Sequence, residues 1–255
     1  MIVRTIKERA LKMLDVDGEL ELVDFSFALP YTWVLVRGSR GRSLGVAMTL
    51  PEEVQTYGNS IDELTVESFV ERLDSLNFIE RTLGLAAVNA ISQYYFDPGD
   101  AEWRDAVELI TEAEPEKVAV IGNMPPVVGA IRDAGIEAYV FERNPKLWDR
   151  GTLSDVLEYW LLPEVDAVIA SATCLVNGTL DLIVDRAKKA KLIVLTGPTG
   201  QLHPELLKGS GVTHVAGMKV VDVDGAIREL KLGRFKGFER FSRKYTLRIP
   251  AEEND

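Results

Sequence analysis

The chain's single cysteine lies in a short polar segment, Ser171–Asp181 (SATCLVNGTLD), directly after the apolar run DAVIA. A thiol can act as a nucleophile or as a ligand for a soft metal. Aliphatic residues follow Cys174, and no neighbour in the sequence is of a type that would activate it. We therefore predict that Cys174 packs as a small apolar residue. The flanking groups Thr173, Asn177 and Thr179 are the better candidates for contacting a ligand.

Polar residues also follow the other short apolar runs in the second half of the chain. Asn123 follows KVAVIG, Glu142 ends EAYVFE, and Thr196 and Pro198 lie at the end of KLIVLTGP. Ligands of an open parallel sheet bind beyond the carboxyl ends of its strands, so these positions predict a polar ligand crevice. Turn formation alone is the alternative, because such residues are common in turns.

Glu142 suggests a nucleotide as one possible ligand. It lies about 20 residues after Gly122, where an acidic residue commonly binds the ribose hydroxyls of NAD or a similar nucleoside. However, the segment GNMPP does not match GxGxxG, and Pro125 and Pro126 remove amides that would face a pyrophosphate. The alternative for Glu142 is a strand-end carboxylate paired with Arg143. A Rossmann enzyme that uses NAD or S-adenosylmethionine is therefore the second hypothesis.

Thiol and imidazole groups are few, which limits direct metal binding. Together with carboxylates such as Glu142 or Asp222, Cys174, His203 and His214 could bind a transition metal. They are widely separated and lack a short-range ligand spacing, and His214 lies in an apolar run typical of a core histidine. Cys174 and His203 are thus weak candidates for metal ligands. A Cys–His nucleophilic pair has no recognisable orienting group.

Strands and helices alternate in the second half of the chain. Short continuous apolar runs of this kind are typical of buried parallel strands. The alternation predicts a doubly wound, Rossmann-like, mostly parallel sheet. The expected strands are Lys117–Gly122, Glu137–Glu142, Asp166–Ser171, Lys191–Gly197 and Val212–Gly217.

The first half has a different pattern, typical of an antiparallel meander flanked by helices. We expect a helix over residues 1–14 and strands over residues 19–29, 31–38 and 43–50. One long or two short helices follow over residues 65–96. A turn-rich joint, DPGDAEW, then predicts a boundary between a small α+β domain, residues 1–97, and a Rossmann-like domain, residues 98–255, which includes a C-terminal extension.

Composition excludes several classes of protein. The chain has 255 residues and a formal net charge of −11, which argues against general nucleic-acid binding. No apolar run approaches the length that spans a bilayer, and no signal-peptide core is present, so we predict a cytoplasmic protein. The basic and aromatic segment of residues 228–248 is expected to pack on the body of the protein, with a nucleic-acid surface as the alternative.

Six motifs together resemble a known family. In chain order they are RTLGLAAVNAIS, VAVIGNMPPVV, VFERNP, DAVIASATCLVNGTLD, LTGPTGQLHPELL and VTHVAGMKVVD. The chain resembles, over nearly its whole length, a family of unknown function described as a heavy-metal chelation domain. The resemblance implies an N-terminal domain similar to that of enolase, a Rossmann-like C-terminal domain and a site in the cleft between them. The positions it implies for that cleft are Asn89, Asn123, Glu142, Thr173, Asn177, Thr179, Thr196 and Pro198.

The leading hypothesis is a small polar or metal-associated ligand bound in an interdomain cleft, in heavy-metal chelation or in the handling or synthesis of a chelator. The candidate ligands are mostly hard oxygen and amide groups, whereas heavy metals favour thiolate and imidazole. A metal would therefore arrive as a chelate or with an organic ligand. A non-catalytic scaffold or subunit is the third hypothesis, and a homodimer is left open.

Overall fold

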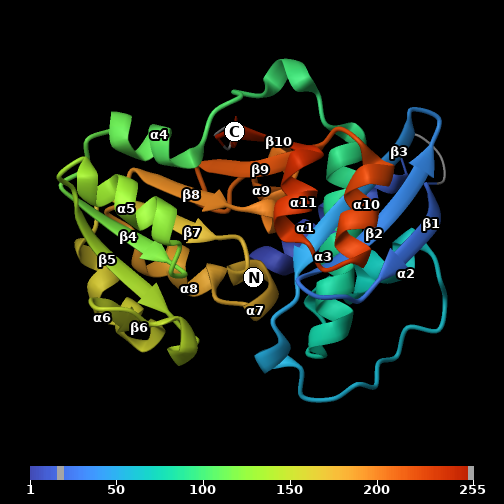
Figure 1. The fold of residues 1–255 in the computed structure, drawn as a ribbon, viewed down its shortest axis with the longest axis horizontal. Helices are drawn as coiled ribbons and strands as arrows, with labels where there is room; N and C mark the ends of the chain where they lie inside the picture. The colour runs from blue at the N-terminus through green and yellow to red at the C-terminus, as the bar shows by residue number, and fades with distance from the viewer. Residues whose placement is uncertain (16–19, 252–255) are drawn as a thin grey trace.

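Two β-sheets form the framework of the protein, and they lie side by side in Figure 1. The computed structural model describes residues 1–15 and 20–251. The predicted first strand begins at Glu19, and the predicted C-terminal domain ends at residue 255; Glu19 and residues 252–255 lie outside the described part. The strands are β1 (Glu21–Ser26), β2 (Tyr31–Gly38), β3 (Gly41–Met48), β4 (Lys117–Ile121), β5 (Glu137–Glu142), β6 (Thr152–Ser154), β7 (Ala167–Ser171), β8 (Leu192–Thr196), β9 (His214–Val220) and β10 (Ser242–Arg248).

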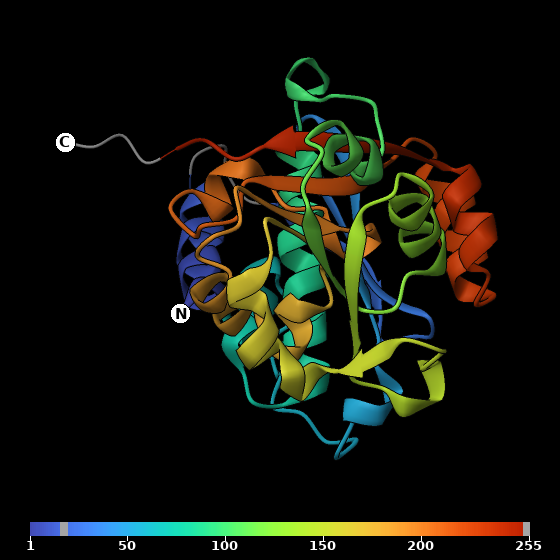
Figure 2. The ribbon, with the colours of Figure 1, turned by 90° about the vertical axis from the view of Figure 1, so that its left-hand side faces the viewer.

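Helices cover both sheets (Figures 1 and 2). They are α1 (Ile2–Leu14), α2 (Val66–Glu71), α3 (Phe78–Tyr95), α4 (Ala106–Glu112), α5 (Pro125–Asp133), α6 (Glu158–Leu161), α7 (Cys174–Asn177), α8 (Leu180–Arg186), α9 (Pro204–Leu207), α10 (Val223–Lys231) and α11 (Phe235–Arg240). The predicted helical region over residues 65–96 forms two α-helices of unequal length, because residues 72–77 interrupt it and the Asn77 side chain caps α3.

The smaller sheet is antiparallel, in the order β1-β2-β3, and both of its faces are covered. Trp33 and Val46 face α10 and α11, whereas Val34 and Ala47 face α3. The α3 backbone lies so close to β3 that a Cβ on Gly45 would come within 2.1 Å of the Ala90 amide nitrogen. A glycine is therefore required at this crossing.

The larger sheet has the order β10-β9-β8-β7-β4-β5-β6, with only β10 antiparallel to its neighbour. Alternate residues of β4 point to opposite faces: Val118 and Val120 pack under α4 and α5, while Ala119 and Ile121 pack on the side of α8. The predicted α/β class and the doubly wound, mostly parallel sheet are confirmed. Chain connections diverge at β4 and β7, and ligand crevices form at such a switch point.

Buried amide groups join the two sheets. Asn89 of α3 donates hydrogen bonds from Nδ2 to the Val46 carbonyl of β3 and to the Thr199 carbonyl, at 2.7 and 2.8 Å. In return, Gln201 Oε1 accepts the Val46 amide, and Thr199 Oγ1 accepts the Met48 amide. One apolar core also runs through both parts of the chain. The division between residues 97 and 98 falls between α3 and α4, and the boundary between two domains at this point stays a prediction.

Two strands were not expected from the sequence. The short β6 carries no apolar run, and β10 falls in the basic segment of residues 228–248. In β10 the exposed Arg243 and Lys244 precede the buried Tyr245 and Leu247, a pattern that suits an edge strand. Tyr245 and Phe238 are fully buried, so the prediction that this segment packs its aromatic residues on the body is confirmed.

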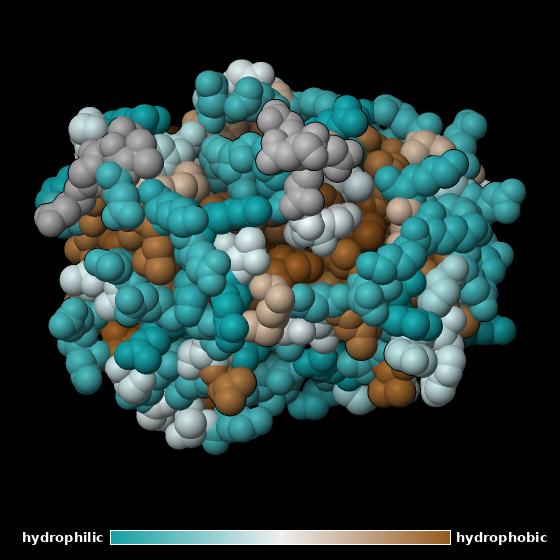
Figure 3. Space-filling view, turned by 180° about the vertical axis from the view of Figure 1, so that it is seen from behind, coloured by the Kyte–Doolittle hydropathy of each residue, from teal (hydrophilic) through white to brown (hydrophobic). Residues whose placement is uncertain are grey.

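The face of the molecule opposite to that of Figure 1 is mostly hydrophilic, with separate hydrophobic areas among the polar side chains (Figure 3). Within residues 1–15 and 20–251, no helix has the length and the apolar character needed to cross a membrane.

Candidate functional site

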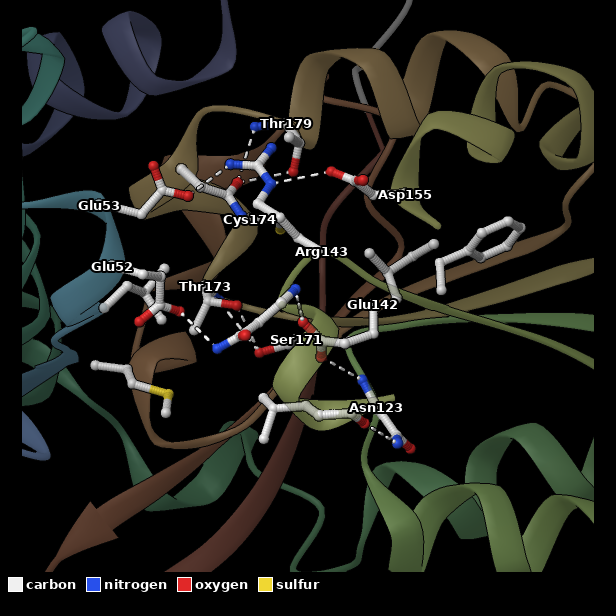
Figure 4. Close-up of a pocket in the computed structure, with 18 of the residues that line it drawn as sticks. Glu52, Glu53, Asn123, Glu142, Arg143, Asp155, Ser171, Thr173, Cys174 and Thr179 are labelled. Carbon is white, nitrogen blue, oxygen red and sulfur yellow. Dashed lines mark hydrogen bonds and ion pairs between the residues drawn. The ribbon is translucent and has the colours of Figure 1, made fainter. Parts of the chain in front are cut away.

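A pocket of about 350 Å³ lies beyond the carboxyl ends of β4, β5 and β7. Its opposite wall is the end of β3 together with the 3-10 helix η1 (Pro51–Glu53). Figure 4 shows Glu52 and Glu53 of this wall facing the side chains that follow the strands of the larger sheet. The pocket therefore lies between the two sheets, at the switch point of the larger one.

Five of the predicted ligand residues line this pocket, and Cys174 lines it with them. The five are Asn123, Glu142, Thr173, Asn177 and Thr179. They come from three different strand ends, β4, β5 and β7, which the parallel sheet brings to one edge. Their contact with a ligand stays a prediction.

The other predicted residues lie elsewhere. Thr196 and Pro198 line a second pocket, of about 440 Å³, under α4, α5 and α11. Asn89 is completely buried and holds β3 against the turn at Thr199, so it fixes the wall of the first pocket without lining it. His203 lines neither pocket; it is the N-cap of α9, where its Nδ1 accepts the Glu205 amide at 3.3 Å.

Glu142 orders the turns at the ends of β4 and β5. Its Oε2 accepts the Asn123 amide at 2.9 Å, and its Oε1 accepts the Asn144 amide at 2.8 Å. Gly122, at a φ of +88°, makes the sharp exit from β4 that presents the Asn123 amide to this carboxylate. The alternative of a Glu142–Arg143 ion pair is wrong, because the Arg143 guanidinium pairs with Glu53 and Asp155 instead.

Arg143 bridges the two sides of the pocket. Its Nη1 contacts Glu53 at 2.9 Å, and its Nε contacts Asp155 at 3.0 Å. Burial disfavours the charged guanidinium, but the hydrogen bonds and charges of both carboxylates outweigh burial and raise the pKa of Arg143. Figure 4 shows this bridge across the upper part of the pocket. It ties η1 to the loop after β6.

The turn between β7 and α8 presents a row of hydroxyl and amide groups. Thr173 Oγ1 donates to Ser171 Oγ at 2.9 Å, and Thr179 Oγ1 donates to Asn177 Oδ1 at 2.8 Å. These contacts are local to the turn, and each hydroxyl oxygen keeps capacity to accept a further hydrogen bond.

Cys174 is 2% exposed, and burial raises the pKa of its thiol. The thiol is therefore neutral and unreactive at ordinary pH, as expected of a packed cysteine. No three His, Cys, Asp or Glu side chains of the described part of the chain come together in a geometry that would hold a metal ion. The lining of the pocket does not fit a bare heavy-metal ion.

Four carboxylates of the pocket were missed by sequence reasoning: Glu52, Glu53, Asp155 and Glu158. Two signals could have found them. Glu52 and Glu53 come shortly after the last strand of the meander, and Glu158 is a lone acidic residue within the largely apolar segment VLEYWLL. Glu158 is 4% exposed, and burial, with the nearby charge of Asp155, raises its pKa to about 7.

The charge of the lining is strongly unbalanced. The described residues around the pocket include five carboxyl groups and one guanidinium, and that guanidinium already serves two of the carboxylates. Such a lining attracts cations and repels anions.

Comparison with known proteins identifies the class. A family model described as "Putative heavy-metal chelation", DUF364, matches residues 105–248, and a second model with the same description, DUF4213, matches residues 12–92. The chain belongs to the DUF364 family. Its N-terminal part carries the DUF4213 match, so both models together cover most of the chain.

Individual relatives agree with this assignment. An uncharacterised protein of Methanocaldococcus jannaschii is 48% identical over 98% of both chains. A crystal structure of a DUF364 protein of unknown function from Pyrococcus horikoshii is 61% identical, with a TM-score of 0.94 over 98% of this chain and 100% of that one. A DUF364 protein of unknown function from Desulfitobacterium hafniense, at 20% identity and a TM-score of 0.74 over 96% of this chain and 98% of that one, shares the fold.

Proposed function

We propose that the protein binds a small, cationic, metal-associated ligand in the pocket between the two sheets, as a step in handling a heavy metal or its chelator. The observation that carries this proposal is the excess of carboxyl groups over guanidinium in a pocket at the switch point of the sheet. The description of the family supports a metal as part of the ligand.

The chemistry of the lining favours a coordinated metal over a bare ion. Oxygen ligands suit hard cations, whereas heavy metals prefer sulfur and nitrogen donors. Since the described residues offer no three-ligand group, the donors that satisfy a heavy metal would belong to the ligand itself. The protein would then supply charge, shape and hydrogen bonds.

A nucleotide is the second candidate, favoured by the position of the pocket beyond β4 and β7. Two features weigh against it. Pro125 and Pro126 open α5 without the amides that would receive a phosphate. The one guanidinium that the described residues contribute to the lining is engaged by Glu53 and Asp155. Stabilisation by NAD or S-adenosylmethionine in a thermal-shift screen, lost in Glu142→Ala, would favour this candidate. The charged lining also differs from the featureless, apolar cleft expected of a scaffold.

Isothermal titration tests the leading proposal. The probes are Zn²⁺ and Ni²⁺ alone, their cationic complexes with ethylenediamine, and their complexes with nitrilotriacetate, which carry negative charge. We expect one cationic metal species to bind per chain and the anionic complexes not to bind. If none of the ions or cationic complexes binds, the proposal is wrong.

A matched pair of variants locates the binding. Glu52→Gln removes one charge from the pocket, and Glu8→Gln removes one from the exposed side of α1. Binding in the pocket predicts a loss of affinity in the first variant alone. Equal losses in both would mean that only the net charge of the chain matters.

A further inference from the structure

Glu158 is the most unusual group of the pocket. It belongs to the short helix α6, its side chain is almost completely buried, and it lines the pocket beside Cys174. Within the described residues, no side chain or main-chain amide donates a hydrogen bond to its carboxyl group, and no cation pairs with it. By contrast, Glu53, Glu142 and Asp155 each accept hydrogen bonds.

A buried carboxyl group without a donor is costly, and native proteins rarely keep one without a reason. The groups that face Glu158 explain its state. Asp155, three residues earlier, repels a second negative charge, the Cys174 thiol is neutral, and Arg143 attracts a negative charge but is engaged by Glu53 and Asp155. The carboxyl group of Glu158 is thus a hydrogen-bond acceptor at the pocket that no donor of the described residues satisfies.

The groups near this acceptor cannot coordinate a metal together. Cys174 is a protonated, buried thiol, and the described residues hold no three-ligand group. A cation in the pocket would instead meet carboxylate oxygens that accept hydrogen bonds. This arrangement suits donors carried by the ligands of an already coordinated metal.

We propose that the pocket recognises a metal as a preformed cationic complex, whose coordinated amine or water groups donate hydrogen bonds to Glu158. This inference rests on the proposed function and names the class of ligand. The complex keeps its own coordination shell, and no bond between the metal and the protein forms. Where Glu158 carries a proton, binding of the complex releases that proton to solvent and leaves the carboxylate paired with the cation. With a pKa of about 7, part of the chains at pH 7 carry this proton.

The probe for this inference is hexaamminecobalt(III), a compact cation whose ammine ligands exchange very slowly. A carboxylate can accept its N–H hydrogen bonds but cannot enter its coordination shell during a titration. Calorimetry at pH 7 in two buffers of different ionisation enthalpy gives both the affinity and the number of protons released. Zn²⁺ alone is titrated in parallel.

We expect one complex to bind per chain, with release of a fraction of a proton that decreases as the pH of the titration is raised from 7 to 8. Glu158→Gln should weaken binding about tenfold or more and abolish the proton release, because a charge-assisted hydrogen bond is lost. The control variant Glu8→Gln should retain both. Proton release is measured on the unmodified chain, so this part of the test does not depend on any variant.

Two results would overturn the inference. One is unchanged affinity and proton release in Glu158→Gln; the other is binding of Zn²⁺ with an affinity that depends on Glu158 while hexaamminecobalt(III) does not bind at all, which would indicate direct coordination. If an ethylenediamine complex binds in the pocket without dependence on Glu158, this inference fails and the proposed function stands. If none of Zn²⁺, Ni²⁺, their ethylenediamine complexes and hexaamminecobalt(III) binds, both fail.

Discussion

Replacing Glu158 by glutamine should stabilise the protein at alkaline pH and have little effect at acidic pH. Burial raises the pKa of this carboxyl from its usual 4.5 to about 7. The folded state therefore holds the proton more tightly than the unfolded state. The contribution of the Glu158 proton to the free energy of unfolding is fully present below about pH 4.5 and decreases as the pH rises. It is lost above about pH 7, where the buried group is ionised.

The size of the effect follows from the two pKa values. The difference between 4.5 and about 7, at about 1.4 kcal/mol for each pH unit, amounts to about 3 kcal/mol. The variant should therefore be more stable than the unmodified chain by up to about 3 kcal/mol at pH 8, and by less than about 1 kcal/mol at pH 5. Glutamine keeps the shape of the side chain and cannot ionise.

Guanidinium chloride unfolding of both chains at pH 5 and pH 8 measures this difference. The exposed carboxylate Glu8 provides the control, because Glu8→Gln should change stability little at either pH. A stability difference between Glu158→Gln and the unmodified chain that is the same at both pH values would refute the reasoning. Such a result would mean that Glu158 titrates as an exposed carboxylate does.

Three further predictions concern the walls of the pocket. Arg143→Ala removes the ion pairs that join Glu53 to Asp155, so the free energy of unfolding should fall by about 1 kcal/mol. Amide hydrogen exchange in η1 should become faster, and unchanged exchange would show that the bridge does not hold η1. Cys174 should react slowly with Ellman's reagent at pH 8 in the native protein and rapidly after unfolding, and fast native labelling would contradict its burial. Asn89→Ala leaves two buried main-chain carbonyls without hydrogen-bond donors, so the free energy of unfolding in urea should fall by about 3 kcal/mol. A fall of less than about 0.5 kcal/mol would mean that these hydrogen bonds do not hold the sheets together.

The positions of five strands in the second half of the chain could be predicted from the sequence because each of these five is a short, continuous apolar run. Glu137–Glu142 was predicted with the bounds it has in the structure, and Lys117–Gly122 with an error of one residue. The short β6 and the charged β10 could not be found in this way. These two are the edge strands of the larger sheet. An edge strand has a neighbouring strand on one side alone and carries more polar residues, so its hydrophobic pattern is weak.

The sequence by itself predicted that a ligand would bind beyond the carboxyl ends of the larger sheet, because Asn123, Glu142 and Thr173 lie at or just after the ends of strands that were expected to run parallel. It also determined that Cys174 would be a packed residue, through its aliphatic neighbours. Only the tertiary structure decided which strand ends share a pocket. Thr196 is the last residue of β8, and the pocket that it lines opens under α4, α5 and α11 instead.

Tertiary structure also decided the charge of the pocket. Glu53 and Arg143 are 90 residues apart, and they meet because the shared apolar core and the hydrogen bonds of Asn89 hold β3 against the larger sheet. The state of Glu158 has the same origin. A carboxyl group has an ordinary pKa in an isolated helix, and it is the packing around α6, together with the nearby charge of Asp155, that makes proton loss from this one costly near neutral pH.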